Sequence, residues 1–184
     1  LFSMHQCVKS AVKDQTSFDY VMHNNLLKNC AISLDANPDN FYYGRSSAIA
    51  PFAISIYPQD QINHHFVADL AAGIALYYHL TGNYHSALEW YFKLLPISIT
   101  LFGEVHLKTA TAYNNIAVMY YYQNEYTLAL EWQEKALLIR EDLFGKDSLE
   151  VENSYNNIGA VYEMIGDYDL ALTWHIKAFK IRVK

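Results

Sequence analysis

The chain has 184 residues, of which 52% are apolar and only 17% are charged, and this composition excludes an intrinsically disordered protein. The formal net charge is −6, and no run of Lys or Arg supplies the basic face that a nucleic-acid-binding protein needs. The apolar stretches are too short and too interrupted to span a bilayer, and no secretory signal pattern occurs.

The cysteine content points to a reducing compartment. Cys7 and Cys30 are the only two cysteines, which is too few for a disulfide framework. We therefore expect a cytoplasmic protein in which both are buried, unreactive thiols.

The first third of the chain, residues 1–65, predicts an irregular helical segment. Residues 5–13 and 18–34 have helical patterns, and 35–44 contain the Pro, Asn and Gly of a loop. A further helix is predicted over 46–57, ended by Pro58.

From about residue 66 the sequence repeats itself. Leu101-Phe102-Gly103 recurs 42 residues later as 143–145, and the turn at 82–84 recurs at 124–126 and 166–168. This period predicts three copies, at about 66–106, 107–148 and 149–184. Positions identical in all three are Ile74/Ile116/Ile158, Tyr78/Tyr120/Tyr162, Tyr84/Tyr126/Tyr168, Ala87/Ala129/Ala171, Leu88/Leu130/Leu172, Trp90/Trp132/Trp174, Lys93/Lys135/Lys177 and Ile97/Ile139/Ile181.

Each copy reads as two helices joined by a tight turn. Apolar residues fall three and four apart on both sides of the turn, which is helical spacing. Gly82, Asn124 and Gly166 suit the left-handed conformation that ends a first helix, and Gly103 and Gly145 are expected to end the second helix in the same way.

Two further features concern the start of a first helix and the regularity of the first copy. Ser148, with Asp147, offers an N-cap for the next first helix. Pro96 lies inside a second helix, where it is predicted to kink or shorten it, and Leu94 replaces the Ala of the other copies. The first copy is therefore expected to be irregular.

One helix pair cannot bury its apolar face alone, so the copies must stack. Small residues such as Ala129 and Gly159 would let the helices approach closely. The equally spaced Trp residues are better explained by packing between repeats than by an aromatic ladder for a ligand. The predicted fold is an all-α, right-handed superhelical α-solenoid with a concave inner wall.

The repeat resembles a known family. The string YNNIAVMY from Tyr113 to Tyr120, followed by NEY at 124–126, AL at 129–130 and KAL at 135–137, resembles the tetratricopeptide repeat (TPR). The 42-residue period and the IREDLFG ending at 139–145 resemble the kinesin-light-chain variety, although Leu107 and Leu149 stand where that family often has Pro.

The first eight residues, LFSMHQCV, are similar to the end of the winged-helix segment that precedes such repeats in STAND signalling ATPases of the NB-ARC type. In those proteins the repeats form a C-terminal sensor. No Walker motif or other phosphate-binding Gly-rich loop occurs in this chain, so we expect no nucleotide or other cofactor.

Catalytic and metal chemistry find little support. The eight His residues are scattered apart from His64-His65, and neither HExxH nor CxxC occurs. We therefore expect no metal site and no catalytic residue, and an enzyme is the least expected class.

The resemblance implies that first-helix residues line the inner wall and bind a partner. The first copy would contribute Asp69, Ala72, Gly73, Leu76, His79 and Leu80. The second and third would contribute Thr111, Asn114, Asn115, Val118, Tyr121 and Tyr122, and then Asn153, Asn156, Asn157, Ala160, Glu163 and Met164.

Two of these residues allow two interpretations. Asn115 and Asn157 occupy the family position that often hydrogen-bonds a peptide backbone, since an amide both donates and accepts. Alternatively, they cap or bridge neighbouring helices. The wall contains Asp69 and Glu163 but no Lys or Arg, which favours a neutral or basic, partly apolar partner over an acidic one.

The sequence thus predicts a protein-interaction module, a sensor or scaffold within a larger signalling protein, with no nucleic-acid or membrane partner. The alternatives are self-association through the repeats and a receptor for a short peptide or small ligand.

Overall fold

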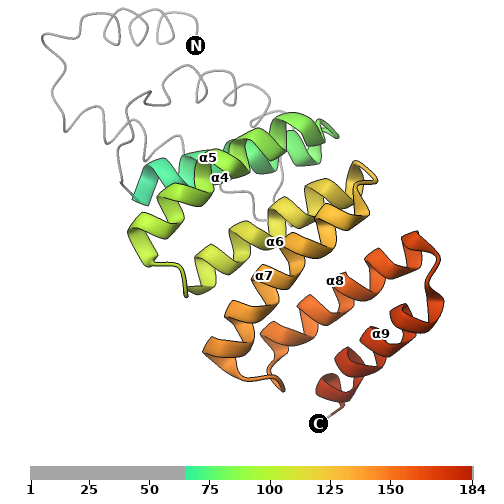
Figure 1. Ribbon diagram of the computed structural model, residues 1–184. Coiled ribbons are helices and arrows are strands. Elements are labelled where there is room, and N and C mark those ends of the chain that lie inside the picture. Colours follow the sequence, from blue (N-terminus) through green and yellow to red (C-terminus); the bar gives the residue numbers. More distant parts are fainter. Residues whose placement is uncertain (1–64, 184) are drawn as a thin grey trace, which may run out of the picture. The chain divides into compact units, whose positions relative to one another are not determined.

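The computed structural model describes residues 65–183, and all regular secondary structure in this part of the chain is α-helical. The predicted all-α repeat class is confirmed, whereas the helices expected within 1–64 lie outside the described residues. The helices are α4 His65–Leu80, α5 Tyr84–Phe102, α6 Leu107–Tyr122, α7 Tyr126–Phe144, α8 Leu149–Ile165 and α9 Tyr168–Arg182 (Figure 1).

The chain divides after Tyr77 into two compact units, 1–77 and 78–184. Helix α4 belongs to the first unit except for its last turn. Its buried face is made by Val67, Leu70 and Ile74, each at most 1% exposed and spaced three and four residues apart. This spacing places their side chains on one face of the helix, as the repeat predicts.

In the second unit each helix packs against its neighbour in the sequence. Contacts join α5 to α6, α6 to α7, α7 to α8 and α8 to α9. Figure 1 shows these helices side by side in chain order. Helix pairs that contact only their neighbours form a repeat stack, in which the core of each pair is completed by the next.

The turn within each copy has the left-handed conformation that the sequence predicted. Gly166 has φ 90° and ψ 8°, and Asn124 is the one non-glycine residue of the described chain with a positive φ, at 63°. The next helix begins at once, because Asp167 Oδ1 accepts a hydrogen bond from the Leu170 amide at 3.1 Å.

The linker between copies differs from the prediction. Gly145 follows α7 with φ 78° and ψ 160°, and Gly103 follows α5 with nearly the same angles. The chain therefore leaves the second helix in an extended conformation with positive φ, which is almost confined to glycine, rather than in the left-handed helical one. Ser148 caps α8 as predicted, with its side chain accepting from the Val151 amide.

Pro96 does not shorten its helix. Helix α5 has 19 residues, the same length as α7, which has no proline. Pro96 lies on the exposed side of α5. Water there can hydrogen-bond the carbonyl group that loses its helical partner, so the helix continues despite the missing amide proton.

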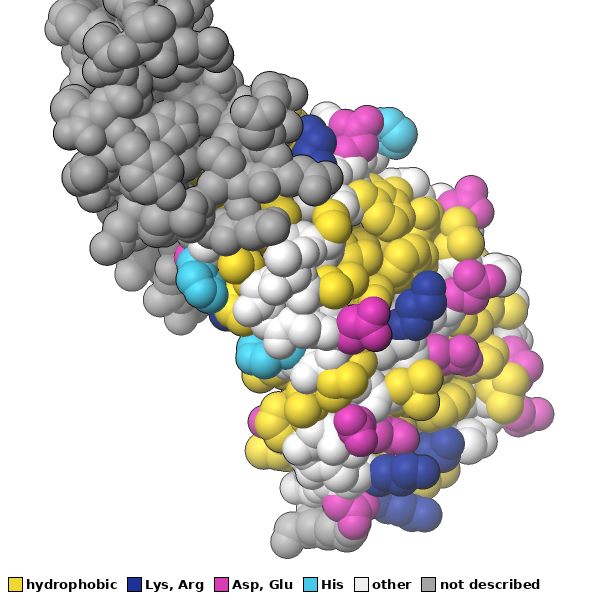
Figure 2. Space-filling view, turned by 60° about the vertical axis from the view of Figure 1, so that its left-hand side comes forward, with side chains coloured by type: hydrophobic (Ala, Val, Ile, Leu, Met, Phe, Trp, Pro, Cys, Tyr) yellow, Lys and Arg dark blue, Asp and Glu magenta, His cyan; other side chains and the backbone are white. Residues whose placement is uncertain are grey.

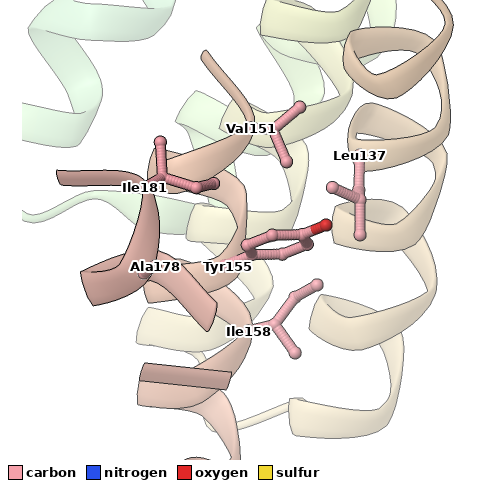
Figure 3. Packing of buried hydrophobic residues seen from close by; sticks show 6 residues of the cluster. All are labelled: Leu137, Val151, Tyr155, Ile158, Ala178 and Ile181. Atoms are coloured by element: carbon pink, nitrogen blue, oxygen red, sulfur yellow. The ribbon is translucent and has the colours of Figure 1, made fainter. Parts of the chain in front are cut away.

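The core around α8 shows how one copy completes the next. Leu137 of α7 and Ile181 of α9 lie on either side of Val151, Tyr155 and Ile158 of α8 (Figure 3). The three α8 residues are spaced four and three apart, so they share one face of the helix. Each buried aliphatic side chain of this kind contributes about 1.5–3 kcal/mol.

The repeated Trp and Lys residues form pairs on the second helices. The tryptophans pack between helices, the interpretation preferred from the sequence; Trp132, for example, lies 5.5 Å from the Phe92 ring and 5.6 Å from Tyr113. Each Lys, three residues after its Trp, holds its ammonium group over the indole, a cation–π contact that explains why both recur. The distances to the ring centroid are 4.1 Å for Lys93–Trp90, 4.0 Å for Lys135–Trp132 and 3.7 Å for Lys177–Trp174.

Candidate functional site

The side chains predicted to line a binding face in the second and third copies all reach solvent. None of them belongs to the buried class. Thr111, Tyr122, Asn153, Glu163 and Met164 are exposed, whereas Asn114, Asn115, Tyr121, Asn156 and Asn157 are partly buried.

A partly open hollow of about 290 Å³ lies between the first helices of these two copies. Five of the predicted wall residues line it, namely Val118, Tyr121, Tyr122, Asn157 and Ala160, whereas Thr111 and Asn153 do not. Its full lining is Ala117, Val118, Tyr121 and Tyr122 of α6, Gln133 of α7, and Asn157, Ala160 and Val161 of α8. Gln133, Ala117 and Val161 are the buried members of this set, so the floor is aliphatic apart from the Gln133 amide, and Asn157 and the phenol rings form part of the wall.

An amide network joins three helices at the side of this hollow. Asn114 Oδ1 accepts one hydrogen bond from Gln133 Nε2 at 3.1 Å and another from Asn157 Nδ2 at 2.9 Å. Gln133 is only 1% exposed, so its amide depends on this acceptor. Of the two interpretations of Asn157, the helix-bridging contact is thus present, and it fixes the position of the wall.

Asn115 has no comparable role. Its side chain is partly buried but makes no hydrogen bond to another residue of the 65–183 region. Asn115 therefore keeps the capacity to bind a partner's backbone.

The third copy replaces the buried Gln with a His. His175, equivalent to Gln133, lies with Nδ1 3.2 Å from Asn156 Oδ1 and with Nε2 3.3 Å from Glu163 Oε1. Asn156 Nδ2 donates to Glu152, a buried carboxylate that is also paired with Arg182. Two of the predicted residues, Asn156 and Glu163, thus lie next to the two nitrogen atoms of one imidazole.

Aromatic rings support the tyrosines of the hollow. Tyr122 stacks on Tyr84 with ring centres 4.7 Å apart and planes within 8°. Tyr121 meets Tyr122 edge to face at 5.5 Å, and His79 lies 5.5 Å from Tyr122. Burial lowers the pKa of His79, because the charged imidazolium loses hydration. The cluster is therefore neutral and held in place at physiological pH.

The described residues contain neither a cluster of metal ligands nor a helix suited to spanning a membrane. Among residues 65–183, no three His, Cys, Asp or Glu side chains come together as metal ligands. None of the helices there combines the length and the apolar character that crossing a bilayer requires.

The profile of the tetratricopeptide repeat matches residues 66–137 and 108–182, which together exceed half of the sequence. The chain belongs to the tetratricopeptide repeat family. TPR repeats generally mediate protein–protein interaction, and the helix pairs, the turns and the stacked cores described above are those of this family. Comparison of the sequence with curated proteins gives no match.

Solved TPR structures of the kinesin-light-chain type share the fold. BtubC (BKLC) from P. vanneervenii is 23% identical, with a TM-score of 0.74 over 98% of this chain and 71% of that protein. A single-substitution variant of a Podosopora anserina putative kinesin light chain with nearly identical TPR-like repeats is 14% identical, also at 0.74, covering 95% and 82%. At these identities the likeness concerns the fold alone.

Sequence reasoning missed the part that second helices play in the site. Gln133 of α7 and His175 of α9 lie at equivalent positions, yet they differ in type, so the repeat comparison did not single them out. The signal was a polar residue at a position that the helical spacing makes buried, since such a residue needs a partner. From the sequence, Tyr84 is identified only as a repeated residue, although its ring stacks on Tyr122 in the structure.

Proposed function

We propose that the face formed by α6 and α8 binds an extended segment of a partner protein, with one side chain of that segment seated in the hollow between them. This makes the chain a non-catalytic interaction module, serving as the sensor or scaffold part of a larger cytoplasmic signalling protein.

The observation that carries the proposal is the hollow itself. A space of about 290 Å³ with an aliphatic floor accepts one large side chain, and it is small for a drug-sized molecule. The partly buried amide of Asn115 and the exposed ring of Tyr122 are available for a peptide backbone beside it. Anchors of this kind, in which a pocket takes a side chain and amides take the backbone, recur in peptide recognition.

Two further features support binding by a preformed surface. The amide network of Asn114, Gln133 and Asn157 fixes α6, α7 and α8 relative to one another without a ligand. The stack on Tyr84 holds the Tyr122 ring. A surface ordered in advance loses less conformational entropy on binding, so more of the contact energy appears as affinity.

A selection experiment tests the proposal. The 184-residue chain is used to select peptides from a random dodecapeptide display library, and selected peptides are then titrated against variants. In Val118→Trp the indole fills the hollow. In the matched control, Leu138→Trp, the indole is placed on α7 at a position where Leu138 is 66% exposed.

We expect Val118→Trp to weaken binding of the selected peptides at least tenfold, and Leu138→Trp to leave it unchanged, with both variants melting within a few degrees of the wild type. Equal binding by all three proteins would show that the hollow is not the binding site.

Self-association is a second candidate, favoured by the outer face of α9. Leu172 and Phe179 are 59% and 61% exposed, whereas Leu137, equivalent to Phe179, is 7% exposed because α8 covers it. A second copy presenting the same stripe could cover this face. Sedimentation of the wild type and of Phe179→Glu tests this candidate. Self-association through α9 requires a concentration-dependent dimer in the wild type that the variant abolishes.

A further inference from the structure

We infer that the partner segment is basic, and that the side chain seated in the hollow is an arginine whose stem lies on the aliphatic floor and whose guanidinium meets the tyrosine rings and Glu163. This inference rests on the proposed function and adds to it the chemistry of the partner.

Charge is distributed unevenly along the repeats. Residues 109–131 and 151–176, which contain most of α6 and α8 and the turns after them, include no Lys or Arg but six acids. The acids are Glu125, Glu131, Glu152, Glu163, Asp167 and Asp169. Every described cation of the second unit lies elsewhere, namely Lys93, Lys108, Lys135, Arg140, Lys146, Lys177, Lys180 and Arg182.

One view of the described helices shows charges of both signs. In the view of Figure 2, Lys and Arg side chains lie next to Asp and Glu side chains, with hydrophobic side chains between them. The binding stretches differ from such a surface because they carry one sign only. An acid-only region attracts cations and repels anionic segments before contact is made.

Three of the six acids remain to act on a partner. Glu152 is buried and already paired with Arg182, whereas Glu131 lies on α7 and Asp169 on α9. Glu125, Glu163 and Asp167 are exposed, and no Lys or Arg of the described chain forms an ion pair with them. The α6–α8 face and its turns therefore carry negative charge that the chain itself does not neutralise.

Glu163 is the acid best placed for the hollow. It follows Ala160, which lines the hollow, by three residues, so the two side chains share one face of α8. Its Oε1 lies 3.3 Å from His175 Nε2. A carboxylate has about four lone-pair sites, so this contact leaves Glu163 able to accept from a guanidinium as well.

The lining of the hollow fits a side chain that is apolar along its length and charged at its tip. Ala117, Val118, Ala160 and Val161 offer an aliphatic surface to a methylene stem, and Tyr121 and Tyr122 offer aromatic rings to the cation. Arginine suits this setting better than lysine, because a planar guanidinium both stacks on a ring and takes a carboxylate through two hydrogen bonds.

The chain already uses cation–π contacts within itself. Lys93, Lys135 and Lys177 each hold the ammonium group within 4.1 Å of an indole centre. Lys177 also lies over the Tyr155 ring of α8, at 5.7 Å, whereas no Lys or Arg of residues 65–183 lies over Tyr121 or Tyr122.

The test uses nonapeptide display libraries that are random except at the central position, which is fixed as Arg, Lys, Leu or Glu. Each pool is selected on the 184-residue chain and on Val118→Trp. A peptide from the best pool is then titrated at low and high salt against Glu163→Gln, with Asp142→Asn as the control, because Asp142 is an exposed acid near the end of α7.

We expect the Arg pool to be enriched at least tenfold over Leu, with Lys between them and Glu depleted. Glu163→Gln should weaken the selected peptide about fivefold or more and reduce the salt dependence, whereas Asp142→Asn should do neither. These effects require an ion pair at the hollow.

The outcomes separate the two proposals. Enrichment of Leu or Glu peptides that Val118→Trp still abolishes would overturn the basic partner and leave the binding site in place. Peptides that bind Val118→Trp as well as the wild type would overturn the proposed function itself.

Discussion

The imidazole of His175 lies directly against the backbone of Gly159, so closely that a β-carbon on Gly159 would meet ring atoms at 2.7 Å. The second copy has Ala117 and Gln133 at the equivalent positions. The third helix pair thus combines the large imidazole of His175 with a glycine, whereas the second combines Gln133 with an alanine. This relationship sets the distance between α8 and α9.

Gly159→Ala should therefore destabilise the protein. The clash involves three ring atoms of a partly buried side chain that contacts Asn156 Oδ1, so overpacking should cost about 1–3 kcal/mol, more than the roughly 1 kcal/mol that Ala gains in helix propensity. Chemical denaturation measures the difference. The double variant Gly159→Ala/His175→Gln reproduces the pair of the second copy and should recover most of the loss; failure to recover would mean that the ring is not the obstacle.

Asn114→Ala should cost about 1–3 kcal/mol of unfolding free energy, because it leaves the buried Gln133 amide without its acceptor and removes the link to Asn157. Urea denaturation gives the value. Asn115→Ala is the matched control, one residue along the same helix, and should change stability by less than about 0.5 kcal/mol. Similar losses in the two variants would argue against the network.

Substitutions of Asn115 and Asn157 should differ in their effects on peptide binding and on stability. Asn157→Ala is expected to lower the unfolding free energy by about 1 kcal/mol, since it loses its hydrogen bond to Asn114. Asn115→Ala should weaken a selected peptide while the melting temperature stays unchanged. Titration and thermal melting on the same samples check this, and the prediction fails if Asn115→Ala binds peptide normally.

Alkaline pH should weaken the contact between α7 and α8. Burial, and then the hydrogen bond from Tyr155 to Glu141 Oε1 at 2.9 Å, raise the pKa of Tyr155 to about 12. A folded pKa above the unfolded value of about 10 means that this stabilisation is complete below pH 10 and is lost as pH rises toward 12.

Denaturation at pH 9 and at pH 11.5 should show a larger fall in stability for the wild type than for Tyr155→Phe, which cannot ionise. Burial also raises the pKa of Tyr91 to about 12, so Tyr91→Phe provides a second comparison. An equal fall in all three proteins would contradict the assignment to these phenols.

The helix pairs could be predicted because the signals were local. Gly166 and Asn124 end their helices where the turns recur, and the spacing of Val151, Tyr155 and Ile158 defines a buried face whatever covers it. Pro96 does not shorten its helix, and Gly145 adopts a different conformation from the predicted one. The cost of Pro96 depends on whether water reaches a carbonyl group, and the ψ angle of Gly145 depends on where the next helix begins.

The site was predictable only in part, because its geometry depends on contacts between copies. The resemblance to the tetratricopeptide repeat pointed to Tyr121, Tyr122 and Asn157, yet Gln133 could be included only once the packing of α7 against α6 and α8 was known. The bond from Asn157 to Asn114 joins one copy to the next at non-equivalent positions. A comparison of equivalent positions in the copies does not reveal such a pair.

The most direct test of the central claim is an NMR titration of the isotopically labelled 184-residue chain with a peptide selected for binding. Binding between α6 and α8 predicts that the amide shifts of Val118, Tyr121, Tyr122, Asn157 and Ala160 move together and saturate at one affinity. Shifts confined to the outer residues of α9, or spread evenly over the chain, would contradict it.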